Sequence, residues 1–344
     1  SCNRRNLKWF VCFFVLSLTP KSPEHVEVLR NISTQFETSL WQPVSSEFIK
    51  AESAVHLFVP VNSSERVREK LRTHGITHEV LLANAEELVE MQTRNDSSDP
   101  RSSSTFYERY HSLEDIYLWI NRTSQDNSAS VKVLLLGSSY EKRPIYALKN
   151  RMWRKNRSVS QNGRCVGVDL NRNFDANWCT EGASSSPCSE IYCGRFPESE
   201  PESQAVSNFL RTQKDLVQIY ISIHSYSQML LFPYSCTTEQ APDHQELLEM
   251  VKEAAQRIRR HYRNNYKYGA GAETIYLAPG GSDDWAYNLG IKYSFTFELQ
   301  DTGRYGFLLP PSHISKACNE ALLAVKTIAL KVLQNRAKIG PNQN

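Results

Sequence analysis

Two polar residues at the ends of apolar runs are the first candidates for chemistry in this chain. His224 follows the mostly apolar run 217–223, and Glu298 lies at the end of the run 293–299. Short runs rich in Ile, Val, Phe and Tyr predict buried strands, and polar groups at strand ends commonly face a crevice in an α/β sheet. A histidine there could bind a metal ion and a glutamate could accept a proton, although either residue alone is more often structural or solvated.

Three further segments contain residue types that recognise a charged substrate. The basic loop 151–157 contains Arg151 and Arg154; taken alone it is a surface loop, and it is short for a nucleic-acid patch. The string Asp-Leu-Asn-Arg-Asn-Phe at 169–174 includes a guanidinium, which can pair with both oxygens of a carboxylate. The turn 277–285 contains Asp283, which in isolation is typical of a turn or a helix N-cap.

Together with the segment 301–307, these strings resemble the zinc metallocarboxypeptidases of the pancreatic A/B type. The resemblance extends to about residue 333 and rests on long, specific strings around His224 and Glu298. It implies an α/β domain whose mixed sheet has helices on both faces, preceded by a small α+β open-sandwich prodomain. It also implies one zinc ion as cofactor and hydrolysis of C-terminal residues from peptides and proteins.

The resemblance assigns roles to five of the polar residues. It makes His224 a zinc ligand and Glu298 the general base that takes a proton from zinc-activated water. Arg154 matches the arginine that stabilises the oxyanion. Asn171 and Arg172 match the pair that holds the terminal carboxylate of the substrate.

Four more residues match positions of substrate contact. Arg151 matches a further substrate-binding arginine, and Tyr276 matches a mobile tyrosine that folds over the bound substrate. Asp283 occupies the floor of the specificity pocket, and Ser235 matches a polar wall. Because a carboxylate in a poorly solvated pocket favours basic side chains, we expect substrates that end in Lys or Arg.

One motif of the family has no counterpart here. The H-x-x-E string that supplies two zinc ligands belongs in a long block, but in this chain Lys149 is followed directly by Asn150. His111 and Glu114 form an H-x-x-E string, yet they match the start of a structural helix. With His224 as its single ligand, zinc would have no defined tetrahedral site.

The missing block leaves two hypotheses. In the first, the gene encodes the secreted zymogen of a B-type zinc carboxypeptidase, and these 344 residues are a skipped-exon or incomplete version of it. In the second, the chain is a genuine inactive variant that at most binds peptides ending in Lys or Arg. The loss of interior strands also predicts an unpaired sheet edge and an underfilled core.

The N-terminal residues 1–22 have the pattern of a secretory signal. Arg4, Arg5 and Lys8 precede the apolar stretch 9–18, which is short for a membrane span; a buried helix is the alternative. The net charge of +3 favours neither nucleic acid nor a membrane surface as partner. We therefore expect an extracellular protein, which agrees with five N-x-[ST] glycosylation triplets at Asn31, Asn62, Asn95, Asn121 and Asn156.

Cysteines also indicate an oxidising compartment. Cys165, Cys179, Cys188 and Cys193 lie in one Ser/Gly-rich loop, and they form no C-x-x-C pair that would favour a zinc knuckle. Spacing alone leaves their pairing open. The family resemblance implies the disulfides Cys165–Cys188 and Cys179–Cys193. Two further cysteines remain unassigned, Cys236 and Cys318.

We expect the prodomain at 23–101. Strands are predicted over 54–61 and 80–83, and helices over 64–74 and 85–93 with Ser64 and Asn84 as N-caps, an order typical of an open-faced α+β sandwich. The polar connector 95–104 should be exposed. It contains Arg101, which suits a trypsin-like protease and matches the activation site of the family.

The catalytic domain is expected at 102–344, with its internal block missing between 149 and 150. A capping box at Ser112 predicts a helix through residue 120. Strands are predicted over 131–136 and 143–149, and helices over 198–211 and 314–331. Strands that alternate with helices indicate a mixed sheet covered on both faces.

Overall fold

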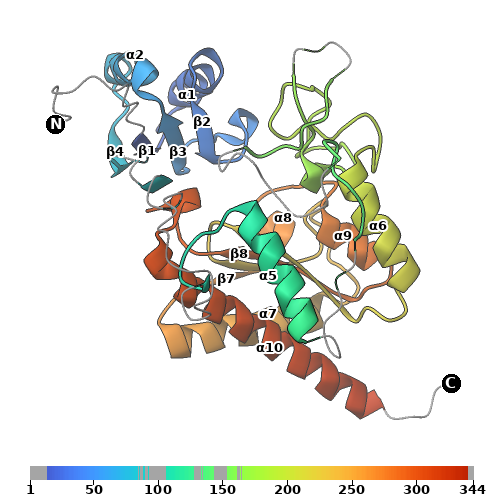
Figure 1. Ribbon diagram of the computed structural model, residues 1–344. Helices are drawn as coiled ribbons and strands as arrows, with labels where there is room; N and C mark the ends of the chain where they lie inside the picture. The colour runs from blue at the N-terminus through green and yellow to red at the C-terminus, as the bar shows by residue number, and fades with distance from the viewer. Residues whose placement is uncertain are drawn as a thin grey trace. The chain divides into compact units, whose positions relative to one another are not determined.

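The computed structural model in Figure 1 describes residues 14–83, four positions between 85 and 92, 106–127, 133–142 without 134, 153–160, 163 and 165–339. The chain divides into two compact units. The first contains residues 1–99 and the segment Gly303–Pro310, and the second contains residues 100–302 and 311–344. Within the first unit, the ring of Phe307 packs edge-on against Trp41 at a centroid distance of 5.6 Å.

The first unit is built on a four-stranded antiparallel sheet with the order β2-β3-β1-β4. Its strands are β1 (Phe14–Leu18), β2 (Ser39–Gln42), β3 (Val55–Val59) and β4 (His78–Leu82). Strand β1 is interior, and its side chains Phe14, Leu16 and Leu18 belong to the core. Within the expected signal segment 1–22, residues 14–18 thus form a strand of this sheet, because an apolar run of this length also fits a buried strand. Residues 1–13 lie outside the described residues.

Two helices pack on one face of this sheet, α1 (Pro23–Gln35) and α2 (Val61–Thr73). The Ser22 hydroxyl caps α1 by accepting a hydrogen bond from the backbone N–H of His25 at 3.2 Å. Helix α2 begins directly after Pro60, so the prediction of Ser64 as its N-cap is wrong. The described positions between 85 and 92 are helical, Asn84 lies outside them, and a short 3-10 turn covers Ser46–Phe48. The α+β open sandwich is confirmed.

The second unit contains a mixed four-stranded sheet with the order β5-β8-β6-β7. Its strands are β5 (Ile219–Ser225), β6 (Met229–Phe232), β7 (Lys267–Ala270) and β8 (Tyr293–Leu299). Strands β5 and β8 are parallel, and β6 runs antiparallel to β8 and parallel to β7. The predicted run 293–299 has the bounds of β8. Strand β5 begins two residues after the start of the predicted run 217–223 and includes His224.

Helices cover both faces of this sheet, as expected (Figure 1). On one face, α7 (His244–Tyr262) and α10 (Ile314–Ile339) pack against Phe295 and Phe297 of β8. On the other, α6 (Pro201–Gln213) and α9 (Ser282–Asn288) form a second core that includes Trp285 and Leu210. The described part of this unit also contains α5 (Leu113–Asp126), α8 (Gly271–Thr274) and the 3-10 turns Leu170–Arg172 and Pro311–His313.

The segments nearest the missing block are poorly buried. Strand β5 is the outermost strand of the described sheet, and its Ile223 side chain is 58% exposed. The strand predicted over 131–136 is wrong for the described positions Val133, Leu135 and Leu136, which are exposed and lie in no strand. Ser112 is the N-cap of helix α5, as predicted, but the helix contains no buried residue. The predicted strand 143–149 lies outside the described residues.

Candidate active site

The two strand-end residues lie next to each other on neighbouring strands. In the parallel pairing of β5 with β8, His224 is the register partner of Glu298. Phe295 and Phe297 point into the core beneath α7 and α10, so the alternate residues of β8, Glu298 among them, face the opposite side of the sheet. His224 and Glu298 therefore share the carboxyl end of two parallel strands, where α/β sheets commonly form ligand crevices.

The imidazole of His224 is partly buried and in contact with its own strand. Its Nε2 atom lies 2.7 Å from the Ser222 hydroxyl. Burial lowers the pKa of His224 below its ordinary value; the charge of Asp283 opposes this shift, and that of Arg154 adds to it. The ring is therefore neutral at pH 7, which is the form of histidine that can bind a metal ion.

The carboxyl group of Glu298 has an oxygen, Oε2, that is buried without a hydrogen-bond partner among the described residues. Burial raises the pKa of Glu298 to about 8; the charge of Arg154 opposes the shift, and that of Asp283 adds to it. A cation beside this carboxyl would favour its ionised form. In the structure as it stands, the group holds a proton at neutral pH.

A buried aspartate organises the two described arginines of the site. Asp169 accepts two hydrogen bonds from Arg154 through Oδ2, at 3.1 Å from Nε and 2.7 Å from Nη2. The same Oδ2 is 4.0 Å from Nη1 of Arg172. Its other oxygen accepts from the backbone N–H of Asn171 at 3.3 Å and so caps the turn that carries Asn171 and Arg172. The sequence string contained this aspartate, but its role was not anticipated.

Arg172 is 1% exposed, and part of its guanidinium remains free. Nε donates to the Gly182 carbonyl at 3.1 Å, and Nη1 donates to the Asn171 carbonyl at 2.8 Å. Nη2 is buried without a partner among the described residues. The ring centroid of Tyr276 lies 5.9 Å from the guanidinium carbon. The structure thus brings Arg172 and Tyr276 together and leaves the Nη2 NH₂ group of Arg172 without an acceptor among the described residues.

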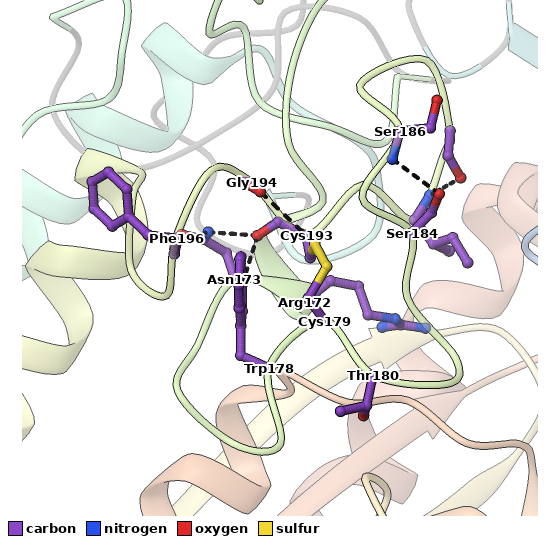
Figure 2. The surroundings of a disulfide bond; sticks show 12 residues. Arg172, Asn173, Trp178, Cys179, Thr180, Ser184, Ser186, Cys193, Gly194 and Phe196 are labelled. Atoms are coloured by element: carbon purple, nitrogen blue, oxygen red, sulfur yellow. Dashed lines mark hydrogen bonds between the residues drawn. A yellow bond between two sulfur atoms is a disulfide. The ribbon is translucent and has the colours of Figure 1, made fainter.

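Two disulfides cross-link the loop segment that contains Arg172. They are Cys165–Cys188 and Cys179–Cys193, the pairing that the resemblance implied. Figure 2 shows how Asn173 supports this loop: its amide donates to the Cys193 carbonyl at 2.8 Å and to the Phe196 carbonyl at 3.3 Å. The covalent and polar links hold the backbone from which Arg172 projects.

Asp283, the predicted floor of the specificity pocket, lies at the start of α9, and Ser235, its predicted wall, lies in the loop after β6. Asp283 is 3% exposed, and its Oδ2 has no partner among the described residues. Asn171 lies beside it, because its Oδ1 accepts a hydrogen bond from the backbone N–H of Ser282 at 3.1 Å. Burial, and then the charge of Asp283, raises the pKa of the neighbouring Asp284 to about 7. Asp284 in turn accepts the backbone N–H of Ser235, so floor and wall are joined through it.

The remaining predicted residues either lie outside the described residues or have another role. Arg101 and Arg151 lie outside the described residues, as does the junction of Lys149 and Asn150. His111 stacks on Phe106, and its Nε2 is 2.6 Å from the Phe106 carbonyl oxygen. The H-x-x-E string that begins at His111 therefore serves the start of α5, as its match to a structural helix implied.

Comparisons with known proteins bear on both units. Family models match residues 146–324 as zinc carboxypeptidase and residues 16–92 as carboxypeptidase activation peptide. The chain belongs to the zinc carboxypeptidase family. Carboxypeptidase B2 of Rattus norvegicus is 42% identical over 93% of this chain and 94% of the relative. Carboxypeptidase B of Bos taurus is 34% identical over 90% and 91%, respectively.

The solved structures agree with these relatives. The crystal structure of thrombin activatable fibrinolysis inhibitor superposes with a TM-score of 0.90 at 41% identity, covering 95% of this chain and 100% of that chain. Carboxypeptidase A from Helicoverpa armigera, at 21% identity and a TM-score of 0.76, shares the fold. The predicted carboxypeptidase-like α/β fold with a prodomain is confirmed, and the chain resembles the zymogens of B-type zinc carboxypeptidases.

The zinc that the family implies does not fit the donors of the described residues. Among them, no group of three or more His, Cys, Asp or Glu side chains is placed to hold a metal ion. The alignment with rat carboxypeptidase B2 extends over 395 positions, whereas 93% of this chain is about 320 residues. About 75 positions of the alignment therefore have no residue of this chain. A gap of this size agrees with the loss of an internal block.

Proposed function

We propose that this chain is a secreted zymogen form of a B-type zinc carboxypeptidase that retains recognition of C-terminal Lys or Arg but lacks a complete zinc site. The observation that carries the proposal is the buried carboxylate of Asp283, whose Oδ2 lies near Asn171 and has no partner among the residues that the structure describes. A buried carboxylate oxygen without a partner is costly unless a ligand satisfies it. A cationic side chain that enters this pocket would satisfy it.

The terminal carboxylate of the peptide would be held a short distance away. Arg172 contributes Nη2, which no other described residue occupies, and the amide of Asn171 lies in the same turn. A guanidinium in a buried site binds a carboxylate strongly because the hydrogen bond is charge-assisted. Arg151, outside the described residues, is proposed as a further contact, and Tyr276 as the ring that covers the bound residue.

Hydrolysis needs more than these recognition residues. In the family, zinc activates water and polarises the scissile carbonyl, which requires three protein ligands. Of these the sequence offers His224 alone. Glu298 is proposed as the general base and Arg154 as the oxyanion partner of the complete enzyme. We infer that the 344 residues as written do not turn over substrate, and that the enzyme requires the block between Lys149 and Asn150.

The biological setting follows from several features. The activation-peptide match supports a zymogen, and we propose cleavage after Arg101 by a trypsin-like protease. Two disulfides support an oxidising, extracellular compartment. Among the described helices, none has the length and apolar character that a membrane crossing requires. The similarity to thrombin activatable fibrinolysis inhibitor connects the chain with fibrinolysis.

The test separates recognition from hydrolysis. The secreted full chain is cleaved with trypsin, and two quantities are measured: release of Arg from a peptide ending in Arg, with zinc present, and anisotropy of the same peptide carrying a fluorophore. We expect binding without turnover, and loss of binding when the peptide is C-terminally amidated or when Asp283→Asn is introduced. Zinc-dependent turnover would overturn the incomplete zinc site, and absence of binding would overturn the recognition.

A second candidate, the complete hydrolase, is favoured by the positions missing from the alignment. It is tested at the level of the gene. Full-length transcripts are sequenced across the codons of Lys149 and Asn150. An in-frame block with H-x-x-E would identify the main product as a working zinc exopeptidase, whereas adjacent codons in the main transcript would leave the binding function as the activity of this gene.

A further inference from the structure

Two consecutive buried carboxylates at the start of α9 have different surroundings. Asp284 is 0% exposed, and both of its oxygens accept from the backbone N–H of Ser235, at 3.0 and 2.9 Å. Oδ2 also accepts from the backbone N–H of Cys236 at 2.7 Å. Asp283, by contrast, has an Oδ2 that finds no hydrogen-bond partner within the described part of the chain. The hydrogen-bonding capacity of Asp284 is therefore directed to the protein, and that of Asp283 remains open to a ligand.

The partner of Asp284 is the loop 233–236, which follows β6. The carbonyl groups of this loop are held from the other side: Ala278 donates its N–H to the Ser235 carbonyl at 2.8 Å, and Ala272 donates to the Tyr234 carbonyl at 2.9 Å. The Ser235 hydroxyl lies so close to Gly271 that a Cβ atom there would collide with it. Ser235 is thus fixed on all sides, and Asp284 makes the buried link to α9.

We propose that Asp284 is the positioning residue for basic-residue selectivity, because it ties the loop with Ser235 to the helix that presents Asp283. This inference rests on the proposed recognition of C-terminal Lys or Arg. A carboxylate can accept several N–H groups at once, and charge-assisted bonds of this kind are stronger than neutral ones. An asparagine would turn an NH₂ group toward the same backbone donors. The wall would then move relative to the floor.

Two further contacts join the loop to α9, and both lie at the far end of the helix, beyond the buried carboxylates. The Tyr234 ring packs edge-on against the half-buried Tyr287 at a centroid distance of 5.5 Å. The Tyr234 hydroxyl donates to Asn288 at 3.0 Å, at the exposed far end of the helix. A solvent-exposed hydrogen bond contributes little because water competes for both partners. The distance between Ser235 and Asp283 is consequently set at the buried end of α9.

The experiment compares two ligands and two variants of the full, trypsin-cleaved chain. Binding constants are measured by anisotropy for peptides that end in Arg and in Ala, because an Ala side chain is too short to reach Ser235. Asp284→Asn should weaken binding of the Arg peptide about tenfold, which corresponds to the loss of roughly one charge-assisted contact. The dissociation constant of the Ala peptide should stay within about twofold of the parent value. Asp215→Asn, the same chemical change on an exposed turn, is the matched control and should alter neither.

A second readout reports on the loop itself. Cys236 is a buried free thiol next to the Asp284 contact, and burial raises its pKa above the ordinary range. Alkylation of Cys236, followed by peptide mapping, should be slow in the parent chain and at least about tenfold faster in Asp284→Asn, because thiol reactivity follows access and thiolate fraction. Because the charge of Asp284 also raises the pKa of Cys236, the rates are compared per thiolate, from their pH dependence, and only the gain that remains reports movement of the loop. This measurement needs no ligand, so it tests the position of the loop even if the parent chain binds no peptide.

The possible results separate the two proposals. Weaker binding of the Arg peptide alone, together with faster alkylation, supports the positioning role. Equal weakening of the binding of both peptides shows general damage and overturns it. Unchanged alkylation overturns it as well. If the parent chain binds neither peptide, the proposed function fails, and alkylation alone decides the positioning role. If Asp284→Asn does not fold, Ser235→Ala keeps the backbone contacts; an unchanged Arg-to-Ala ratio in that variant overturns the role of the wall.

Discussion

The carboxylate of Asp169 should contribute most of the electrostatic stability around Arg172. Asp169→Asn preserves the shape of the side chain but removes the charge between two guanidinium groups. Arg172 is 1% exposed, and Asp169 is the carboxylate within 4.0 Å of it among the described residues. The variant also places an NH₂ group where Oδ2 accepts from Arg154. A buried cation then lacks a counter-charge.

The expected cost follows from the burial of the two pairs. Removing one partner of a fully buried ion pair costs about 3–5 kcal/mol, because the other charge stays desolvated. The Arg154 side chain is 35% exposed and can recover solvation, so the lower end of that range applies. We expect a loss of about 3 kcal/mol. With a urea dependence of about 2–3 kcal/mol per molar, the unfolding midpoint should fall by about 1 M.

The assay is urea unfolding of the second unit, followed by tryptophan fluorescence, with constant slope as the criterion for comparing midpoints. Glu253→Gln is the matched control, because it breaks two partly exposed ion pairs in the same unit, with Arg257 and with Lys331, whose side chains are 42% and 34% exposed. Exposed pairs of this kind contribute about 0.3–0.5 kcal/mol. A midpoint for Asp169→Asn as close to the parent as that of Glu253→Gln would refute the reasoning.

Three further predictions concern glycosylation, the pH dependence of stability and the disulfides. Asn156 should remain unglycosylated, because its amide is buried and donates to Glu200 at 2.7 Å; glycopeptide mapping of the secreted protein should instead find occupied sites at Asn31, Asn62 and Asn121, which are exposed. Stability should fall by about 1–2 kcal/mol between pH 6.5 and 8. In the folded protein the pKa values of Asp284 and Glu298 are raised above their unfolded values. The stabilisation given by their protonated forms is therefore full at low pH and is lost as pH rises through about 7 and 8. Thermal melts whose midpoint rises over this interval would contradict this prediction. Reduction of the two disulfides, which close loops of 23 and 14 residues, should lower stability by about 3 kcal/mol each and make the loop susceptible to limited proteolysis; a proteolysis rate unchanged by dithiothreitol would count against this.

Local patterns predicted the elements whose signals are contiguous in the chain. The apolar run 293–299 is buried over its first five residues, and β8 has the same bounds. The capping box at Ser112 is realised, because its hydroxyl accepts from the backbone N–H of Asp115 at 3.1 Å. In both cases the deciding interactions lie within a few residues of each other, so a sequence pattern contains them.

Interactions between distant segments explain what the sequence did not reveal. The apolar residues 14–18 fit a signal segment as well as a strand until their pairing with β3, about forty residues later, is known. Asp284 acquires its role from a loop 49 positions earlier. The triplet at Asn156 is a local motif, but its burial against Glu200 is tertiary. The family resemblance supplied the site residues that composition and periodicity alone would have left as ordinary surface or core positions.

The position of β5 at the edge of the described sheet has a genetic consequence. If the proposed block is lost, one excision would remove both the metal-ligand motif and the interior strands expected within it, which accords with the exposure of Ile223 on β5. A lineage that selected for a non-catalytic binding protein would keep the scaffold and replace the two ligands by point substitutions. Removal of a whole structural block is instead the signature of exon skipping or of an exon omitted when the coding sequence was assembled, and it favours an intact hydrolase at this locus.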